Sequence, residues 1–249
     1  MSLSGKNALV TGASRGIGRG IAEGLAEAGA SIGVNHPPSD YEAEAAAATV
    51  DAIKLAGGTA VPISGDVSDE SSVRAMVNKF EAEFGTPDVL VNNAGILTKS
   101  PLAEMSVEQW DELLSVNLRS VFLTTRFALP AMQERGSGRI INIASQLGFK
   151  GASELVHYSA AKGGIIAFTR ALAREVAPEL TVNTIAPGPV DTDMTTGMGD
   201  EDRRSMDYIP LARRGQVEDI VPTAVMLAGS GGDYYTGQTL SPDGGDAMH

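Results

Sequence analysis

The stretch NALVTGASRGIG (residues 7–18) joins a short apolar run to three glycines and then to a helical pattern. Gly12, Gly16 and Gly18 stand where a strand would turn into a helix, and small residues there let a ligand approach the backbone. The free N–H groups at the start of such a helix favour a phosphate. Tight turns need glycine anyway, so the cluster alone is weak evidence. Its place after a first strand favours a dinucleotide site.

The rest of the chain repeats this alternation of strand and helix. Strands are expected at 7–11, 30–35, 60–63, 88–92, 139–144, 180–186 and 238–240, and helices at 17–28, 41–56, 69–84, 107–134, 157–176 and 217–228. Several strands are almost continuously apolar, as in a parallel sheet with helices on both faces. No linker interrupts the pattern, so residues 1–249 are predicted to form a single α/β domain, a Rossmann-type doubly wound parallel sheet.

Composition argues against several classes of partner and site. The formal net charge of −12 disfavours nucleic acid and anionic membranes as partners, because both need cationic patches. The chain has no cysteine, which excludes disulfides, thiolate metal sites and cysteine nucleophiles, and no metal site is expected. No apolar run approaches the roughly 20 residues of a membrane helix, and the N-terminus lacks a secretory leader pattern. A cytoplasmic protein is therefore expected.

The residues after the predicted second strand bear on the choice of dinucleotide. NAD sites usually place an acidic residue there, which binds the ribose 2′-hydroxyl. This chain has Asn35 and His36, and its first acid is Asp40, beyond two prolines. Arg15, within the glycine turn, offers a guanidinium suited to a 2′-phosphate. NADP is favoured on these grounds, NAD stays possible, and a solvated loop arginine is the alternative for Arg15.

Two further stretches suggest a site. HYSAAKGGI (157–165) places Tyr158 and Lys162 on one face of a predicted helix, a spacing that a solvated helix face also produces by chance. Residues 187–211 contain prolines, glycines, acids and methionines with weak periodicity. This composition predicts a mobile flap at about 190–210 that closes over a substrate. An ordinary surface loop is the alternative.

Together these motifs resemble the short-chain dehydrogenase/reductase family over essentially the whole chain. The matching stretches, in order, are TGASRGIG (11–18), GDV (65–67), NNAG (92–95), SVNLRSVF (115–122), INIAS (141–145), YSAAK (158–162), PGPVDTDM (187–194) and GQTLSPDGG (237–245). The chain looks most like the branch that contains 3-oxoacyl-carrier-protein reductases and bacterial glucose 1-dehydrogenases. Each match is short, but their order and spacing leave little room for accident.

The resemblance implies four catalytic residues. Tyr158 would exchange a proton with the substrate oxygen, and Lys162 would lower the pKa of Tyr158 by placing a cation nearby. Ser145 would donate to the substrate oxygen, and Asn117 would hold a water that links Lys162 to solvent. Cofactor contacts are implied for Gly12, Ser14, Arg15, Gly16, Ile17, Gly18, Asn35, His36, Asp66, Val67, Asn93, Gly95, Tyr158, Lys162, Pro187, Gly188, Val190 and Thr192.

The resemblance also implies the activity. The expected enzyme is an NADP(H)-dependent oxidoreductase that interconverts a ketone and a secondary alcohol, with 3-oxoacyl thioesters as one candidate substrate. Pro130, Gln133 and Glu134 stand where carrier-protein reductases commonly have basic residues, which puts carrier docking in doubt. A sugar or polyol dehydrogenase is the alternative, and a catalytically silent dinucleotide-binding module is a remote one. A homotetramer is expected, built partly from the apolar faces of residues 113–129 and 160–173 and from the C-terminal segment.

Overall fold

Seven parallel strands pair into one sheet in a computed structural model that describes residues 2–196 and 208–248. The strand order is β3-β2-β1-β4-β5-β6-β7. The strands are β1 Asn7–Val10, β2 Ser31–His36, β3 Thr59–Ser64, β4 Val89–Asn92, β5 Gly138–Ile143, β6 Leu180–Ile185 and β7 Thr239–Leu240. Each lies within one residue of its predicted bounds. The doubly wound parallel sheet is confirmed.

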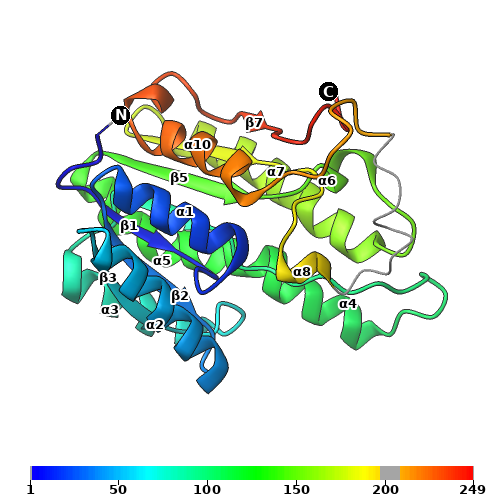
Figure 1. Ribbon diagram of the computed structural model, residues 1–249, viewed down its shortest axis with the longest axis horizontal. Helices are drawn as coiled ribbons and strands as arrows, with labels where there is room; N and C mark the ends of the chain where they lie inside the picture. Colours follow the sequence, from blue (N-terminus) through cyan, green and yellow to red (C-terminus); the bar gives the residue numbers. More distant parts are fainter. Residues whose placement is uncertain (1, 197–207, 249) are drawn as a thin grey trace.

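Helices cover both faces of this sheet (Figure 1). One face carries α1 Gly16–Glu27, α2 Asp40–Leu55 and α10 Val217–Ala228, and the other carries α3 Glu70–Phe84, α5 Ser120–Arg135 and α7 Val156–Val176. The apolar side of each helix packs on the sheet, and this gives two large hydrophobic clusters, one on each face. The structure also contains the short helices α6 Leu147–Lys150 and α8 Asp193–Thr196 and the turn η2 Ser230–Gly232.

The predicted helix at 107–134 is interrupted, which corrects the sequence-based expectation. It consists of α4 Val107–Leu114, a π-helical turn η1 Ser115–Arg119, and α5. A π-helical turn adds a residue to one turn and is common at functional sites. Asn117 lies in this turn and is fully buried. Periodicity over the whole segment cannot reveal one inserted residue, because the apolar pattern resumes after it.

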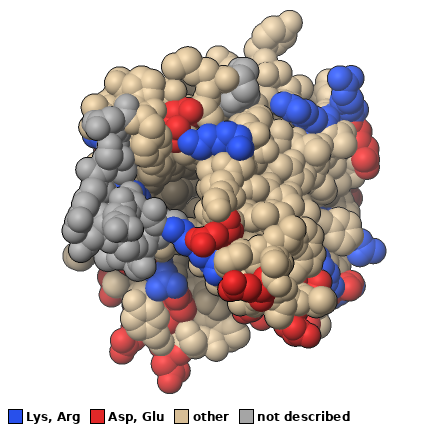
Figure 2. All heavy atoms as spheres, turned by 90° about the vertical axis from the view of Figure 1, so that its right-hand side faces the viewer, with Lys and Arg blue, Asp and Glu red and all other residues tan. Residues whose placement is uncertain are grey.

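The strand order positions the candidate site. The chain runs outward from β1 to β2 and β3, and then returns to β4 on the other side of β1. In open parallel sheets, ligands bind outside the carboxyl ends of the strands at such a reversal. Figure 2 shows that end of the molecule, where a hollow opens and Lys, Arg, Asp and Glu side chains gather around it.

A chain of buried polar side chains ties α5 and α7 to the sheet. Asn92 Nδ2 donates to Thr125 Oγ1 on α5 at 3.0 Å and to Asn142 Oδ1 on β5 at 2.8 Å. Asn142 Nδ2 in turn donates to Thr169 Oγ1 on α7 at 2.9 Å. These bonds satisfy buried amides and fix the two helices that lead to the site.

Candidate active site

The glycine turn provides a phosphate-binding helix end. Helix α1 begins at Gly16, Arg15 makes no side-chain cap, and the first turn carries no acid. Its first N–H groups are therefore open to an anion. Gly18 has to be glycine, because a Cβ there would lie 2.2 Å from Gly12 O. A Cβ at Gly16 would lie 3.7 Å from the Thr192 side chain, so Thr192 faces the turn.

Asn35 and His36 lie beside this turn, and their side chains contact backbone groups of the protein. Asn35 Oδ1 accepts from Gly12 N at 3.1 Å, and Asn35 Nδ2 donates to the carbonyls of Ile63 and Gly65. His36 is buried, with its Nδ1 2.9 Å from Pro37 O. Asn35 therefore shapes the glycine turn, and its side chain is already engaged where the sequence suggested a ribose contact.

Arg15 and Ser14 share one carboxylate. Arg15 Nη2 lies 2.8 Å from Glu42 Oε1, and Ser14 Oγ donates to Glu42 Oε2 at 2.6 Å. The Arg15 guanidinium also lies 5.7 Å from the centroid of the Tyr41 ring. Sequence reasoning missed Glu42. The spacing Ser39-x-x-Glu42 is that of a capping box, which would turn the carboxylate back to Ser39, whereas Ser39 accepts from Glu42 N and the carboxylate crosses to the glycine turn.

Asp66, Val67 and Asn93 have structural partners at the edge of the site. Asp66 Oδ1 accepts from the amide and the hydroxyl of Ser68, which forms the turn before α3. Val67 is buried. Asn93 Nδ2 donates to the carbonyls of Thr11 and Gly12 at 3.0 Å each. Asn93 thus holds β1 and the glycine turn beside β4.

Ser145 and Tyr158 meet beyond the carboxyl end of β5. Ser145 follows β5 by two residues, and its Oγ accepts from Leu147 N at 3.1 Å. Tyr158 lies in the first turn of α7. Burial raises the pKa of Tyr158 to about 12, and a hydrogen bond with the Ser145 side chain opposes this rise. The direction is opposite to the lowering expected from Lys162. At neutral pH the Tyr158 hydroxyl therefore keeps its proton.

Lys162 is buried one helical turn from Tyr158. Its Nζ donates to Ile143 O at 3.0 Å and lies 5.5 Å from the centroid of the Tyr158 ring. Burial lowers the pKa of Lys162 to about 8. Lys162 is itself costly to bury as a cation, and it bonds the Ile143 carbonyl. It therefore does not offset the effect of burial on the Tyr158 phenolate, and the pKa of Tyr158 rises.

Asn117 joins the site through the loop after β4. Its Oδ1 accepts from Ile96 N at 2.8 Å, and its Nδ2 donates to Ile96 O at 2.9 Å. A Cβ on Gly95 would lie 3.4 Å from Asn117 Oδ1 and 3.6 Å from Lys162 Nζ. The π-helical turn thus brings Asn117, Gly95 and Lys162 together, and the small residue keeps the space between them open.

The segment after β6 borders the same site. Gln146 N donates to Pro187 O at 3.1 Å, and Gly188 approaches Asp243 so closely that a Cβ would lie 2.8 Å from Asp243 Cα. Val190 is buried and pairs with Gly215. Residues 197–207, which form most of the predicted flap, lie outside the described residues.

His157 is a buried neighbour of Tyr158 that the sequence did not single out. Its Nε2 lies 3.0 Å from Thr98 Oγ1, and its Nδ1 has no hydrogen-bond partner among the described residues. Burial lowers the pKa of His157, so the ring is neutral at pH 7. It packs the start of α7 against the loop after β4. In the sequence, only its position next to Tyr158 indicates that His157 lies near the site.

The arrangement suits the binding of a dinucleotide at the carboxyl end of the sheet. An uncapped helix end lies at the reversal of strand order. A protonated phenol and a buried cation lie near the carboxyl end of β5 in the same sheet. Among residues 2–196 and 208–248, no group of three or more His, Cys, Asp or Glu side chains is placed to hold a metal ion. Within the same ranges, no helix has the length and apolarity needed to cross a membrane.

Comparison with known proteins places these observations in a family. The family model described as short chain dehydrogenase matches residues 6–203. The 3-oxoacyl-[acyl-carrier-protein] reductase of Staphylococcus aureus (strain Mu50) is 44% identical over 245 residues, which cover 98% of each chain.

Two solved structures share the fold over nearly their whole length. A blue fluorescent protein from a metagenomic library, solved in complex with NADPH, superposes with a TM-score of 0.92 at 37% identity and covers 100% of both chains. A putative NAD(P)-dependent gluconate 5-dehydrogenase from Beutenbergia cavernae superposes with a TM-score of 0.92 at 39% identity and covers 98% of both chains. The chain therefore belongs to the short-chain dehydrogenase family and is an NAD(P)-dependent oxidoreductase that acts on carbonyl and alcohol groups.

Proposed function

We propose that this chain is an NADP(H)-dependent oxidoreductase that interconverts a ketone and a secondary alcohol, with Tyr158 as its acid and base. The observation that carries the proposal is that Tyr158 lies within reach of the Ser145 side chain and of buried Lys162, at the carboxyl end of the sheet. A bound nicotinamide supplies or accepts the hydride. In ketone reduction, Tyr158 donates its proton to the carbonyl oxygen, and Ser145 orients that oxygen by a hydrogen bond.

Lys162 and Asn117 support this proton transfer. The Lys162 ammonium stabilises the phenolate that Tyr158 becomes after it has donated its proton. Asn117 holds the Ile96 backbone in place, and we propose that the π-helical turn around it also holds a water that links Lys162 to solvent. An intact relay of this kind argues against the silent binding module, because a sensor needs no proton donor.

The contacts of two arginines bear on whether the substrate is carried by an acidic protein. The relative from S. aureus is named as a reductase of carrier-bound 3-oxoacyl groups, so 3-oxoacyl thioesters remain a candidate class. A carrier is acidic, yet the basic side chains near the end of α5 are engaged within the chain. Arg135 donates to the carbonyls of Thr86 and Pro87, and Arg139 pairs with Asp233 at 2.5 Å. These contacts argue against docking of an acidic carrier at Arg135 and Arg139, and a sugar or polyol stays the alternative substrate class.

A substrate panel tests these alternatives directly. The purified protein would be assayed in both directions, with NADPH or NADP, on a 3-oxoacyl thioester of coenzyme A, the same acyl group on a carrier protein, and a set of sugars and polyols. Turnover of the carrier form well above the coenzyme A form would contradict the small-molecule preference. No turnover of any substrate, despite cofactor binding, would favour the silent module.

Arg15→Ala should weaken NADPH binding by about 10- to 150-fold. A charge-assisted hydrogen bond contributes about 1.5–3 kcal/mol, and each 1.4 kcal/mol corresponds to about tenfold in affinity. NADH lacks the 2′-phosphate, so its affinity should change little. Fluorescence titration of both cofactors measures the effect. Equal weakening of both would mean that Arg15 only supports the fold of the turn.

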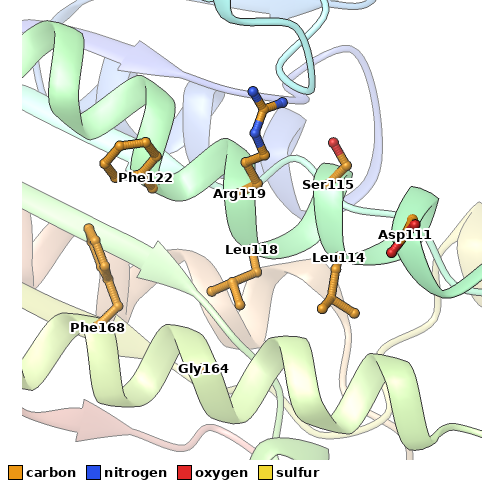
Figure 3. Close-up of a pocket in the computed structure, with 8 residues that line it drawn as sticks. All are labelled: Asp111, Leu114, Ser115, Leu118, Arg119, Phe122, Gly164 and Phe168. Atoms are coloured by element: carbon orange, nitrogen blue, oxygen red, sulfur yellow. The ribbon is translucent and has the colours of Figure 1, made fainter.

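A homotetramer is proposed from an apolar groove on the surface. The groove has a volume of about 730 Å³ and lies between α4–η1–α5 and α7, with the lining side chains shown in Figure 3. Leu114, Leu118 and Phe122 line one side and Phe168 the other, and 47% of Phe122 is exposed. Exposed apolar surface of this kind is typical of an interface. The cytoplasmic location likewise remains a prediction.

Phe122→Glu should shift the assembly toward smaller species. The substitution places a charge in the apolar groove, where burial between copies would be costly. Light scattering at micromolar concentration is expected to show a mass near four times 25.8 kDa for the wild type and a lower mass for the variant. Leu55→Glu, at an exposed position on α2, is the matched control. A monomeric wild type would contradict the proposal.

A further inference from the structure

The glycine turn contains a carboxylate where a 2′-phosphate would bind. Glu42 is buried, and its two oxygens contact different donors, Arg15 and Ser14, at 2.8 and 2.6 Å. The Arg15 side chain remains 49% exposed. The Arg15 guanidinium and the Ser14 hydroxyl are thus already bound to one anion.

Contacts on both sides of Glu42 hold this carboxylate in place. Ser39 accepts from Glu42 N at the start of α2, and Thr49 Oγ1, two turns further along, donates to Ser14 O at 3.1 Å. The Tyr41 ring lies against the Arg15 guanidinium. Helix α2 is therefore fixed to the turn on both sides of Glu42, and the ion pair belongs to the packing of the turn.

The position of the Glu42 carboxylate disfavours NADP and favours NAD. A 2′-phosphate carries up to two negative charges, and it can bond Arg15 and Ser14 only by sharing or displacing the Glu42 carboxylate. Like charges close together in a partly buried site repel each other. The 2′-hydroxyl of NAD is neutral and can donate to a carboxylate. Arg15 therefore favours NADP, whereas Glu42 favours NAD.

We propose that Glu42 is a specificity-determining residue whose carboxylate competes with the 2′-phosphate of NADP for Arg15 and Ser14. The inference rests on the proposed function in one respect, that the adenosine ribose binds at this turn. The charge of Glu42 sets how strongly the enzyme prefers NADP over NAD. The net preference of the wild type is accordingly smaller than Arg15 alone would give.

Glu42→Gln removes the charge with little change of shape. The amide oxygen can still accept from Ser14, and the amide NH2, which cannot accept from Arg15, breaks the ion pair. The dissociation constant for NADPH is expected to fall about tenfold, which corresponds to about 1.4 kcal/mol. The constant for NADH should stay the same or rise. Both are measured by fluorescence titration without substrate, so turnover is not needed. Glu44→Gln, an exposed carboxylate on the same helix, should change neither value.

The outcomes separate the possible failures. Weaker NADPH binding in Glu42→Gln would overturn the proposal and show that Glu42 positions Arg15 for the phosphate. Unchanged binding of both cofactors would also overturn it while leaving the proposed oxidoreductase intact. If the folded wild type bound neither dinucleotide, the proposed function itself would fail. Thermal unfolding of each variant shows that the comparison is made between folded proteins.

Discussion

Tyr158→Phe is expected to lower turnover by about 10²- to 10⁴-fold, the typical contribution of a positioned acid or base. Only the hydroxyl is removed, so the ring keeps its place on α7 beside Lys162. Because burial raises the pKa of Tyr158 to about 12, the wild-type hydroxyl is protonated at neutral pH and ready to donate in ketone reduction. Without it, the carbonyl oxygen has no proton donor at that position.

Steady-state assays and NADPH titration test this prediction together. Cofactor affinity should remain nearly the same, so the loss appears in kcat rather than in binding. Tyr234→Phe, on a fully exposed tyrosine, is the matched control and should keep full activity. If Tyr158→Phe kept more than about a tenth of the wild-type rate, the role of Tyr158 would be wrong.

Lys162→Met is expected to remove most activity and yet to stabilise the fold at pH 7. Loss of a preorganised charged donor typically costs about 10²- to 10³-fold in kcat. Burial lowers the pKa of Lys162 from its ordinary value of 10.5 to about 8, which corresponds to about 3 kcal/mol of unfavourable free energy for the charged form. Methionine has a similar shape and no charge to desolvate, and the lost bond to Ile143 O offsets part of the gain.

The sign of the pH dependence follows from the two protonation states. Below pH 8, Lys162 is charged in both the folded and the unfolded chain, so the wild type bears the full penalty. Between about pH 8 and 10.5 the folded chain loses the proton first, and the stability of the wild type rises relative to the variant. Denaturant unfolding at pH 7 and pH 10 measures this change.

An exposed lysine provides the control for this experiment. Lys54→Met, on the exposed side of α2, removes a charge that is already in water and is the matched control. A Lys162→Met variant that is less stable than the wild type by the same amount at both pH values would contradict the prediction. Burial of the Lys162 ammonium would then have no unfavourable free energy.

The sequence by itself determined the fold, and it selected candidate site residues that the structure brings close together. Apolar runs, helical periodicity and the glycine turn are local patterns, and a parallel sheet with helices on both faces follows from their alternation. The strand bounds agree to within one residue for this reason. Gly95, Asn117 and Lys162 do lie together, and Tyr158 contacts Ser145. The family resemblance, which rests on the order of motifs along the chain, selected these residues, and their catalytic roles stay predictions.

Only the tertiary structure decided which partners the polar side chains of the site have and how burial shifts their pKa values. Glu42 and Ser14 are 28 residues apart, and nothing local shows that the carboxylate crosses to the glycine turn. Asn35 became a structural residue because its amide bonds three backbone groups from other segments. The pKa of Tyr158 rises although Lys162 is one turn away, because burial outweighs a neighbouring cation. Burial and contacts between distant segments depend on packing in three dimensions, which spacing along the chain does not contain.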